Sequence, residues 1–215
     1  MQSKRFIIQT RCTASQLDIN PKTQLATRGG PLQEIEQARR HLKNANLAGK
    51  AQENLRSRIL QWLDEHDDAL YRTCLKGHLT GSAVIIDPTR PATLLIHHKK
   101  LKMWLQPGGH ADGQGDLAQV ALREATEETG LTSLKVLSPA IDLDIHTIPE
   151  RGDEPEHLHL DVRFLVIAPA GSVASPDEME TMGAIWVSQD DPDGLIASDE
   201  LRRLIDRAFF VASAL

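Results

Sequence analysis

The segment 108–131 constrains the fold most, because it joins a glycine turn to a helix whose two ends are both marked by the sequence. Asp116 has the side chain of a typical helix N-cap, and Gln119 three residues later completes a start that resembles a capping box. Gly130 suits the position after the last helical turn, where the backbone φ angle is positive. We therefore predict a helix over about 117–129, preceded directly by a glycine-rich turn.

The regions on either side of this helix favour a sheet. Short apolar runs bounded by turn residues are typical of strands, and they occur near 82–86, 93–97, 103–106, 140–148, 158–168 and 184–187. The stretches 31–66 and 199–212 are helical in pattern, with apolar residues three or four positions apart. The combination predicts an α/β (α+β) fold, an α/β/α sandwich with a mixed central sheet and an N-terminal helical extension.

The chain divides into three regions. Residues 1–30 have a local excess of basic side chains, and we interpret them as a poorly ordered lead, with a targeting segment as the alternative. Residues 31–70 form the helical extension, which either packs against the main domain or makes the surface of a homodimer. Residues 71–215 form the main domain.

Composition excludes several classes of protein. The chain has 215 residues, 40% of them hydrophobic, and a formal net charge of −6, so we expect no bulk binding of nucleic acid. No apolar run approaches the roughly 20 residues that cross a bilayer, and the first residues do not resemble a signal peptide. Cys12 and Cys74 lack metal-ligand spacing and are interpreted as reduced thiols. We expect a soluble, cytoplasmic protein without membrane contact.

Three glutamates lie on one face of the expected helix. Glu124, Glu127 and Glu128 are three or four positions apart, so their carboxylates adjoin. Each like-charge pair costs the helix about 0.2–0.5 kcal/mol, and acids near its C-terminus oppose its dipole. Clustered hard oxygen ligands suit Mg²⁺ or Mn²⁺, which would explain the arrangement. The alternative is an ordinary, solvated, charge-rich helix face.

The spacing of these residues resembles the Nudix box, whose form is G, five residues, E, seven residues, then R-E-U-x-E-E-x-G-U with U apolar. Gly109 stands at the first glycine, and residues 123–131 follow in register. The isolated glutamate of the pattern falls on Gly115, which has no side chain. Asp112 and Asp116 are the neighbouring acids that could take its place, although Asp116 is also the expected N-cap.

The resemblance implies that residues 71–215 are a catalytic domain. Nudix enzymes hydrolyse a diphosphate (pyrophosphate) linkage, usually in a nucleoside diphosphate derivative or a similar small molecule, with Mg²⁺ or Mn²⁺. The implied metal ligands are the carbonyl of Gly109 and the carboxylates of Glu124, Glu127 and Glu128. Because Gly115 departs from the pattern, the alternative is a catalytically impaired binding or regulatory module on the same fold.

The resemblance also implies a role for each charged residue of the helix. A diphosphate repels a nucleophile, so a cation is needed to neutralise charge and to acidify water. Glu124 or Glu128 is then the candidate for the base that deprotonates the attacking water. Arg123 is expected to hold one glutamate in place.

A second polar group lies outside this motif. Alternation over 157–164 places four side chains on one face of an expected strand, namely His157, His159, Asp161 and Arg163. Because such a titratable set is dense, we favour a functional interpretation: Arg163 holds a substrate phosphate, and the histidines contact phosphate or a second metal. For Asp142 and Asp144 on the preceding strand, a solvent-facing position is favoured.

The remaining candidates are weaker. Trp104 could stack on a base or could pack half-buried, and His110 follows the glycine of the motif. Asp177, Glu178 and Glu180 could supply a further acid from a loop, or could form a solvated acidic turn.

Overall fold

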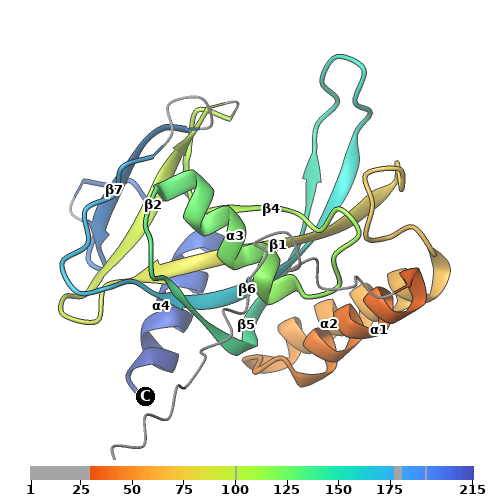
Figure 1. Cartoon of the computed structure of the whole chain (residues 1–215), viewed down its shortest axis with the longest axis horizontal. Helices are drawn as coiled ribbons and strands as arrows, with labels where there is room; N and C mark the ends of the chain where they lie inside the picture. Colours follow the sequence, from red (N-terminus) through yellow and green to blue (C-terminus); the bar gives the residue numbers. More distant parts are fainter. Residues whose placement is uncertain (1–29, 100, 177–180, 192) are drawn as a thin grey trace, which may run out of the picture.

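The computed structural model describes residues 30–99, 101–176, 181–191 and 193–215 (Figure 1). The expected lead before Gly30 and the acidic candidates Asp177, Glu178 and Glu180 fall outside these residues. The helices are α1 (Pro31–Asn44), α2 (Gly49–Glu65), α3 (Leu117–Thr129) and α4 (Asp199–Ala212). The strands are β1 (Gly77–Ile86), β2 (Ala92–His98), β3 (Trp104–Leu105), β4 (Gly108–His110), β5 (Lys135–Ile148), β6 (His157–Ile167) and β7 (Thr181–Ser188).

The described strands form one mixed sheet. Its order is β3-β2-β1-β6-β5, with β4 paired to β1 and β7 paired to β2. Strands β1 and β6 run parallel over their whole length, from Gly77 opposite Leu158 to Ile86 opposite Ile167, and the other pairs are antiparallel. The predicted mixed central sheet is therefore confirmed.

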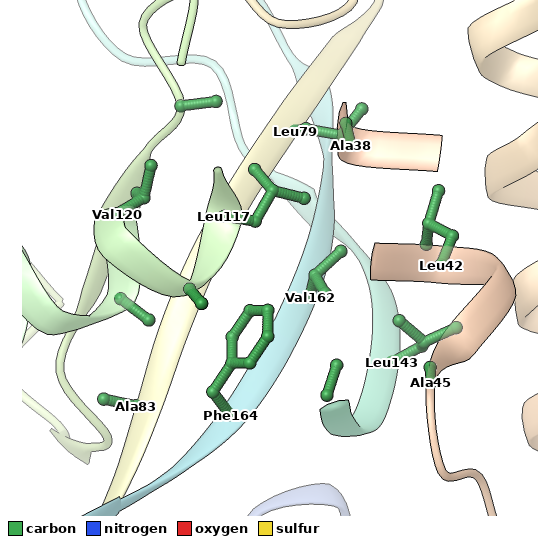
Figure 2. Packing of buried hydrophobic residues seen from close by; sticks show 14 of the residues in the cluster. Ala38, Leu42, Ala45, Leu79, Ala83, Leu117, Val120, Leu143, Val162 and Phe164 are labelled. Atoms are coloured by element: carbon green, nitrogen blue, oxygen red, sulfur yellow. The ribbon is translucent and has the colours of Figure 1, made fainter. Parts of the chain in front are cut away.

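Helices cover both faces of this sheet. On one face, α3 packs over β1 and β6, where Leu117 and Val120 meet Leu79 and Phe164 (Figure 2). On the other face, α4 packs over the opposite side of the same strands through residues such as Leu204. Because successive strand residues point to opposite faces, each central strand contributes to both cores. The result is the predicted α/β/α layering.

The two N-terminal helices belong to the first of these cores. Ala38 and Leu42 of α1 are completely buried beside Val162 and Leu143 of the sheet (Figure 2). The amide of Gln52 on α2 pairs with the backbone of Leu143, donating to its carbonyl at 2.9 Å and accepting from its N–H at 2.8 Å. The helices thus pack against the main domain, the first of the two alternatives; a homodimer stays a prediction.

The ends of α3 agree with the sequence. The Asp116 carboxylate accepts a hydrogen bond from the backbone N–H of Gln119 at 3.3 Å, and Gly130 has a φ angle of 67°. Three strands begin at least three residues earlier than predicted, namely β1, β5 and β7. The start of β1 at Gly77 was missed because its first half contains polar residues, which are nevertheless buried. Strand β5 starts at Lys135, and its register against β6 shifts between Leu137 and Asp142. None of the described helices is both long and apolar enough to cross a membrane.

Gly115 lies directly against α1. Its backbone N–H donates to the Glu34 carboxylate at 2.6 Å, and a Cβ atom at this position would overlap the Glu34 carbonyl oxygen. The adjacent Asp116 carboxylate is 3.2 Å from Nε2 of His41, which is also on α1. The N-terminal extension therefore occupies the space in which the Nudix pattern would place a glutamate side chain.

A methyl group at Gly115 should displace α1. We expect Gly115→Ala to lower the free energy of unfolding by about 1–3 kcal/mol, because the clash is with backbone that cannot rotate away. The matched control is Gly30→Ala, where an added Cβ meets nothing within 4 Å; it should change stability by less than about 1 kcal/mol. Urea unfolding measures both, and equal stabilities would contradict this packing.

Candidate active site

The acidic face of α3 lies against the glycine turn, which forms β4. Gly109 has no side chain to separate them, and a Cβ atom there would overlap the Glu124 carboxylate. The backbone N–H of Gly108 donates to Oε2 of Glu128 at 3.0 Å. The turn and the helix predicted separately from the sequence are thus one unit, in which carboxylates of the helix contact the backbone of the turn.

Arg123 joins these acids to one another. Its Nη1 lies 2.5 Å from Oε1 of Glu124 and 3.6 Å from Oε2 of Glu127, and its Nη2 donates to the carbonyl of His110 at 3.3 Å. The Glu124 side chain is 16% exposed and that of Glu127 is 49% exposed. Glu124 is therefore largely buried beside the turn, whereas Glu127 is exposed to solvent.

These residues fit a divalent cation. The donors are hard oxygens, the type that Mg²⁺ and Mn²⁺ prefer. The close approach of Glu124 to Gly109 leaves carboxylate and backbone next to each other, which a larger residue at position 109 would prevent. Of the predicted ligands, Glu124 therefore lies against Gly109 and Glu128 accepts from the neighbouring Gly108 N–H, while Arg123 contacts Glu124 and Glu127.

The acids next to Gly115 have other partners. Asp112 forms a two-pronged ion pair with Arg72, at 2.9 Å for each oxygen, and this hydrogen bonding lowers the pKa of Asp112. The hydrogen bond from His41 likewise lowers the pKa of Asp116. Both candidates for replacing the missing glutamate are thus engaged in structural contacts.

Arg163 is buried among three aspartates on the other face of the sheet. Its guanidinium donates to Asp161 at 2.8 Å, to Asp142 at 3.2 Å and to Asp144 at 2.9 Å. Arg203 of α4 also donates to Asp142. Burial alone would lower the pKa of Arg163, but the three carboxylates raise it above its usual value, so this side chain is always charged.

The expectation that Asp142 and Asp144 face solvent is wrong. Asp142 is 2% exposed, because α4 covers this face of β5 and brings Arg203 to it. Burial raises the pKa of Asp142, against the opposing effect of both arginines. The phosphate-binding role of Arg163 stays a prediction, and each nitrogen of its guanidinium already donates to a carboxylate.

A cavity of about 340 Å³ opens beside Arg163. Its lining includes Met103 and Gln106 on either side of β3, His146 near the end of β5, and Ser198 just before α4. Gln106 is two residues before the glycine turn, but the residues that line the cavity include none of β4 or α3.

Four histidines from three strands lie close together. His78 of β1, His110 of β4 and two residues of β6, His157 and His159, bring one ring nitrogen each to within 4.8 Å of one another. The last three were candidates from the sequence, and His78 was not among them. The parallel register that places His78 opposite His159 involves residues far apart in the chain, and no local pattern reveals it.

Burial lowers the pKa of three of these rings. Together with smaller effects of neighbouring histidines, and of Arg72 for His110, it lowers the pKa of His159 to about 2 and that of His110 to about 4. Burial also lowers the pKa of His78. At neutral pH these three imidazoles are therefore uncharged, which suits a metal ion better than a phosphate.

Trp104 is half-buried. Its side chain packs against the core under α4, and its ring lies 4.9 Å from that of His97. These contacts agree with the packing alternative, while stacking on a base stays a prediction.

The chain is similar to known proteins over most of its main domain. The model of the NUDIX domain matches residues 77–207. A probable DHNTP pyrophosphohydrolase of Lactococcus lactis is 31% identical over 90 residues, 41% of this chain and 52% of that protein. A putative 8-oxo-dGTP diphosphatase of Bacillus subtilis is 32% identical over 108 residues, 50% of this chain and 65% of that protein.

Two further matches are more distant. An m7GpppN-mRNA hydrolase, NUDT17, of Xenopus laevis is 26% identical over 139 residues. The crystal structure of a C. elegans Ap4A hydrolase binary complex superposes with a TM-score of 0.52 at 18% identity, covering 64% of this chain and 98% of that one. The chain spans 46% to 65% of the length of the curated relatives it matches, and the structural match supports the fold alone.

Removing the charge of Arg163 should destabilise the protein severely. We expect Arg163→Met to lower the free energy of unfolding by about 3–5 kcal/mol, since it leaves Asp161 and Asp142 buried without their main partner. The control Arg203→Met removes a half-exposed partner of Asp142 and should cost less than about 1 kcal/mol. A raised KM with unchanged stability would instead support the phosphate-binding role.

The histidine group predicts a pH dependence of stability. The unfolded chain takes up protons on His110 and His159 below about pH 6.5, whereas the folded chain does not until about pH 4 and pH 2. In chelator-treated protein the free energy of unfolding should therefore fall as pH drops from 6.5 to 5, by up to about 1.4 kcal/mol per pH unit for each histidine. In urea unfolding at several pH values, His159→Gln should reduce this slope; an unchanged slope would exclude His159 as a source.

Proposed function

The chain belongs to the Nudix family, and we propose that it hydrolyses a diphosphate linkage in a nucleoside diphosphate derivative or a similar small molecule, using Mg²⁺ or Mn²⁺. One observation carries the proposal: Glu124 and Glu128 both contact the Gly108–Gly109 backbone, and Arg123 links Glu124 to Glu127. Fold-level likeness alone would not support an activity, because one fold hosts many functions.

The proposed ligands are the carbonyl of Gly109 and the carboxylates of Glu124, Glu127 and Glu128. When bound, the cation neutralises charge on the phosphates and acidifies nearby water. Arg123 positions Glu124 through the 2.5 Å ion pair and fixes the turn through the His110 carbonyl. This contact ties the helix to the turn, which would keep Glu124 beside the Gly109 backbone.

The reaction is a displacement at phosphorus by water. A bond forms between the water oxygen and one phosphorus, and the bond from that phosphorus to the bridging oxygen breaks. The departing phosphate takes the electron pair, and the proton of the water passes to a carboxylate. Glu124 and Glu128 both remain candidates for this base: the first is paired with Arg123, and the second accepts a hydrogen bond from the backbone N–H of Gly108.

The rest of the substrate is proposed to occupy the cavity beside Gln106 and Arg163. Its size suits part of a nucleotide-sized molecule, since ligand cavities are about 300–1,000 Å³. The names of the relatives from L. lactis and B. subtilis, a pyrophosphohydrolase and a diphosphatase, support the type of linkage. Of the substrate contacts predicted from the sequence, Arg163 lines this cavity and Trp104 neighbours two lining residues, whereas His110, His157 and His159 do not line it.

A catalytically impaired binding module is the second candidate, and Gly115 favours it. The missing side chain is replaced by contacts with α1, and both Asp112 and Asp116 are held by other partners. The three glutamates of the motif on α3 are all present, however, and two of them contact the turn, which supports a metal-dependent activity. Enzymatic activity is therefore the better supported of the two.

A substrate panel with active-site variants tests the proposal. With Mg²⁺ and a range of nucleoside diphosphate derivatives, the wild type should release a monophosphate product from at least one compound. Glu127→Gln combined with Glu128→Gln should abolish that turnover, because two of the anionic ligands are lost. Glu53→Gln on α2 is the matched control and should leave the rate unchanged.

The outcomes separate the alternatives. Retained activity in the double variant would remove the assignment of the metal ligands. Tight binding without product across the whole panel, measured by calorimetry, would support the impaired module instead. Comparison of the single variants Glu124→Gln and Glu128→Gln at saturating Mg²⁺, where weaker metal binding is compensated, identifies the base as the residue whose loss lowers kcat more.

A further inference from the structure

We propose that His78, His110, His157 and His159 form a second metal site that binds a transition-metal ion of the Zn²⁺ type. The site is separate from the carboxylates of α3 and differs from them in donor chemistry. It rests on the arrangement of four side chains from three strands, not on the proposed hydrolase activity.

The strand register brings the four rings together. His78 lies opposite His159 in the parallel pair β1–β6, and His110 lies opposite Thr80 in the antiparallel pair β1–β4. His157 is two residues before His159 and therefore points to the same face of β6. The ligand nitrogens of the four rings all lie within 4.8 Å of one another.

Two of these nitrogens are buried without a partner. Nε2 of His78 and Nε2 of His110 make no hydrogen bond within the described part of the chain, and His78 as a whole is 3% exposed. Buried polar atoms are rarely left unsatisfied, and each such atom calls for an explanation such as a bound ion. A cation shared by the rings would satisfy both nitrogens at once.

The opposite nitrogens of two rings contact backbone carbonyls. Nδ1 of His157 is 2.8 Å from the carbonyl of Pro155, and Nδ1 of His78 is 3.4 Å from the carbonyl of Cys74. A carbonyl only accepts, so these contacts place the proton on Nδ1 and leave the Nε2 lone pair directed into the cluster. Metal-binding histidines are commonly oriented by such an outer hydrogen bond.

The spacing also suits tetrahedral coordination. Nε2 of His157 and Nε2 of His159 are 3.3 Å apart. Two nitrogens bound tetrahedrally to one zinc ion lie about 3.3 Å apart, because the Zn–N distance is about 2.0–2.1 Å. The wider pairs, up to 4.8 Å, would close by small rotations of the rings.

The donor set selects the type of metal. Imidazole nitrogen suits Zn²⁺, Cu²⁺, Ni²⁺ and Fe²⁺, whereas Mg²⁺ and Mn²⁺ prefer oxygen. Four protein ligands leave no open position, which is typical of a structural zinc site. Since His110 directly follows Gly109 and points to the opposite face of β4, an ion here would fix the strand whose other face contacts Glu124.

Metal binding to the chelator-stripped full chain tests the site. Dialysis against Zn²⁺ in excess Mg²⁺, with bound zinc quantified by mass spectrometry, should give one zinc per chain. The same result is expected for Glu127→Gln/Glu128→Gln, which lacks the carboxylate ligands. His78→Gln and His157→Gln should each weaken zinc binding more than about 100-fold. Loss of a residue that only hydrogen-bonds a metal ligand typically costs about 10- to 100-fold, and loss of a ligand itself should cost more.

The control is His146→Gln, because His146 is a half-exposed histidine beside His159 that is not one of the four. It should retain one zinc per chain. Thermal unfolding of each stripped variant shows whether it is folded, and Zn²⁺ should raise the Tm of the wild type but not of folded His78→Gln.

A spectroscopic measurement needs no variant. Co²⁺ added to the wild type should give the intense visible absorption of tetrahedral nitrogen coordination. The proposal is overturned if the wild type binds no zinc, if Co²⁺ shows only a weak octahedral spectrum, or if zinc binding is lost in the double glutamate variant and kept in His78→Gln.

Discussion

The parallel pairing of β1 with β6 determines where the polar groups of this protein lie. It sets His78 opposite His159 and Thr80 opposite Asp161, and β4 adds the glycine turn and His110 on the other edge of β1. A slip of one residue would exchange the two faces of a strand, moving buried apolar residues to the polar side. The histidine group, the aspartates and the glycine turn are therefore positioned by one register.

Buried charge makes that register specific. Asp161 accepts hydrogen bonds from Arg163 and from the hydroxyls of Thr80 and Ser82, at 2.7–2.8 Å, so β1 and β6 are joined by side chains as well as by backbone. Such networks contribute little net stability, because desolvation offsets the attraction, but a misaligned strand would leave charges unpaired. We infer that they act chiefly by excluding alternative pairings.

The sequence predicted best those features that depend on neighbours along the chain. The limits of α3, its capping residues and the shared face of Glu124, Glu127 and Glu128 follow from spacing within a single helix, and the structure has them as expected. The burial of Asp142 and the contribution of His78 were missed, because both depend on segments distant in sequence, namely α4 and β6. The departure at Gly115 had no visible reason until α1 was seen to lie on it.

The packing of α1 against Gly115 has a consequence for where the protein can be divided. Similarity to the family begins at residue 77 and ends at residue 207, inside α4. The apolar residues of α1 and α2 complete the core around Leu79 and Phe164, so a fragment trimmed to those limits would expose that core to water. The region that matches the family is thus smaller than the region that shares one core, because α1 and α2 belong to that core together with the sheet.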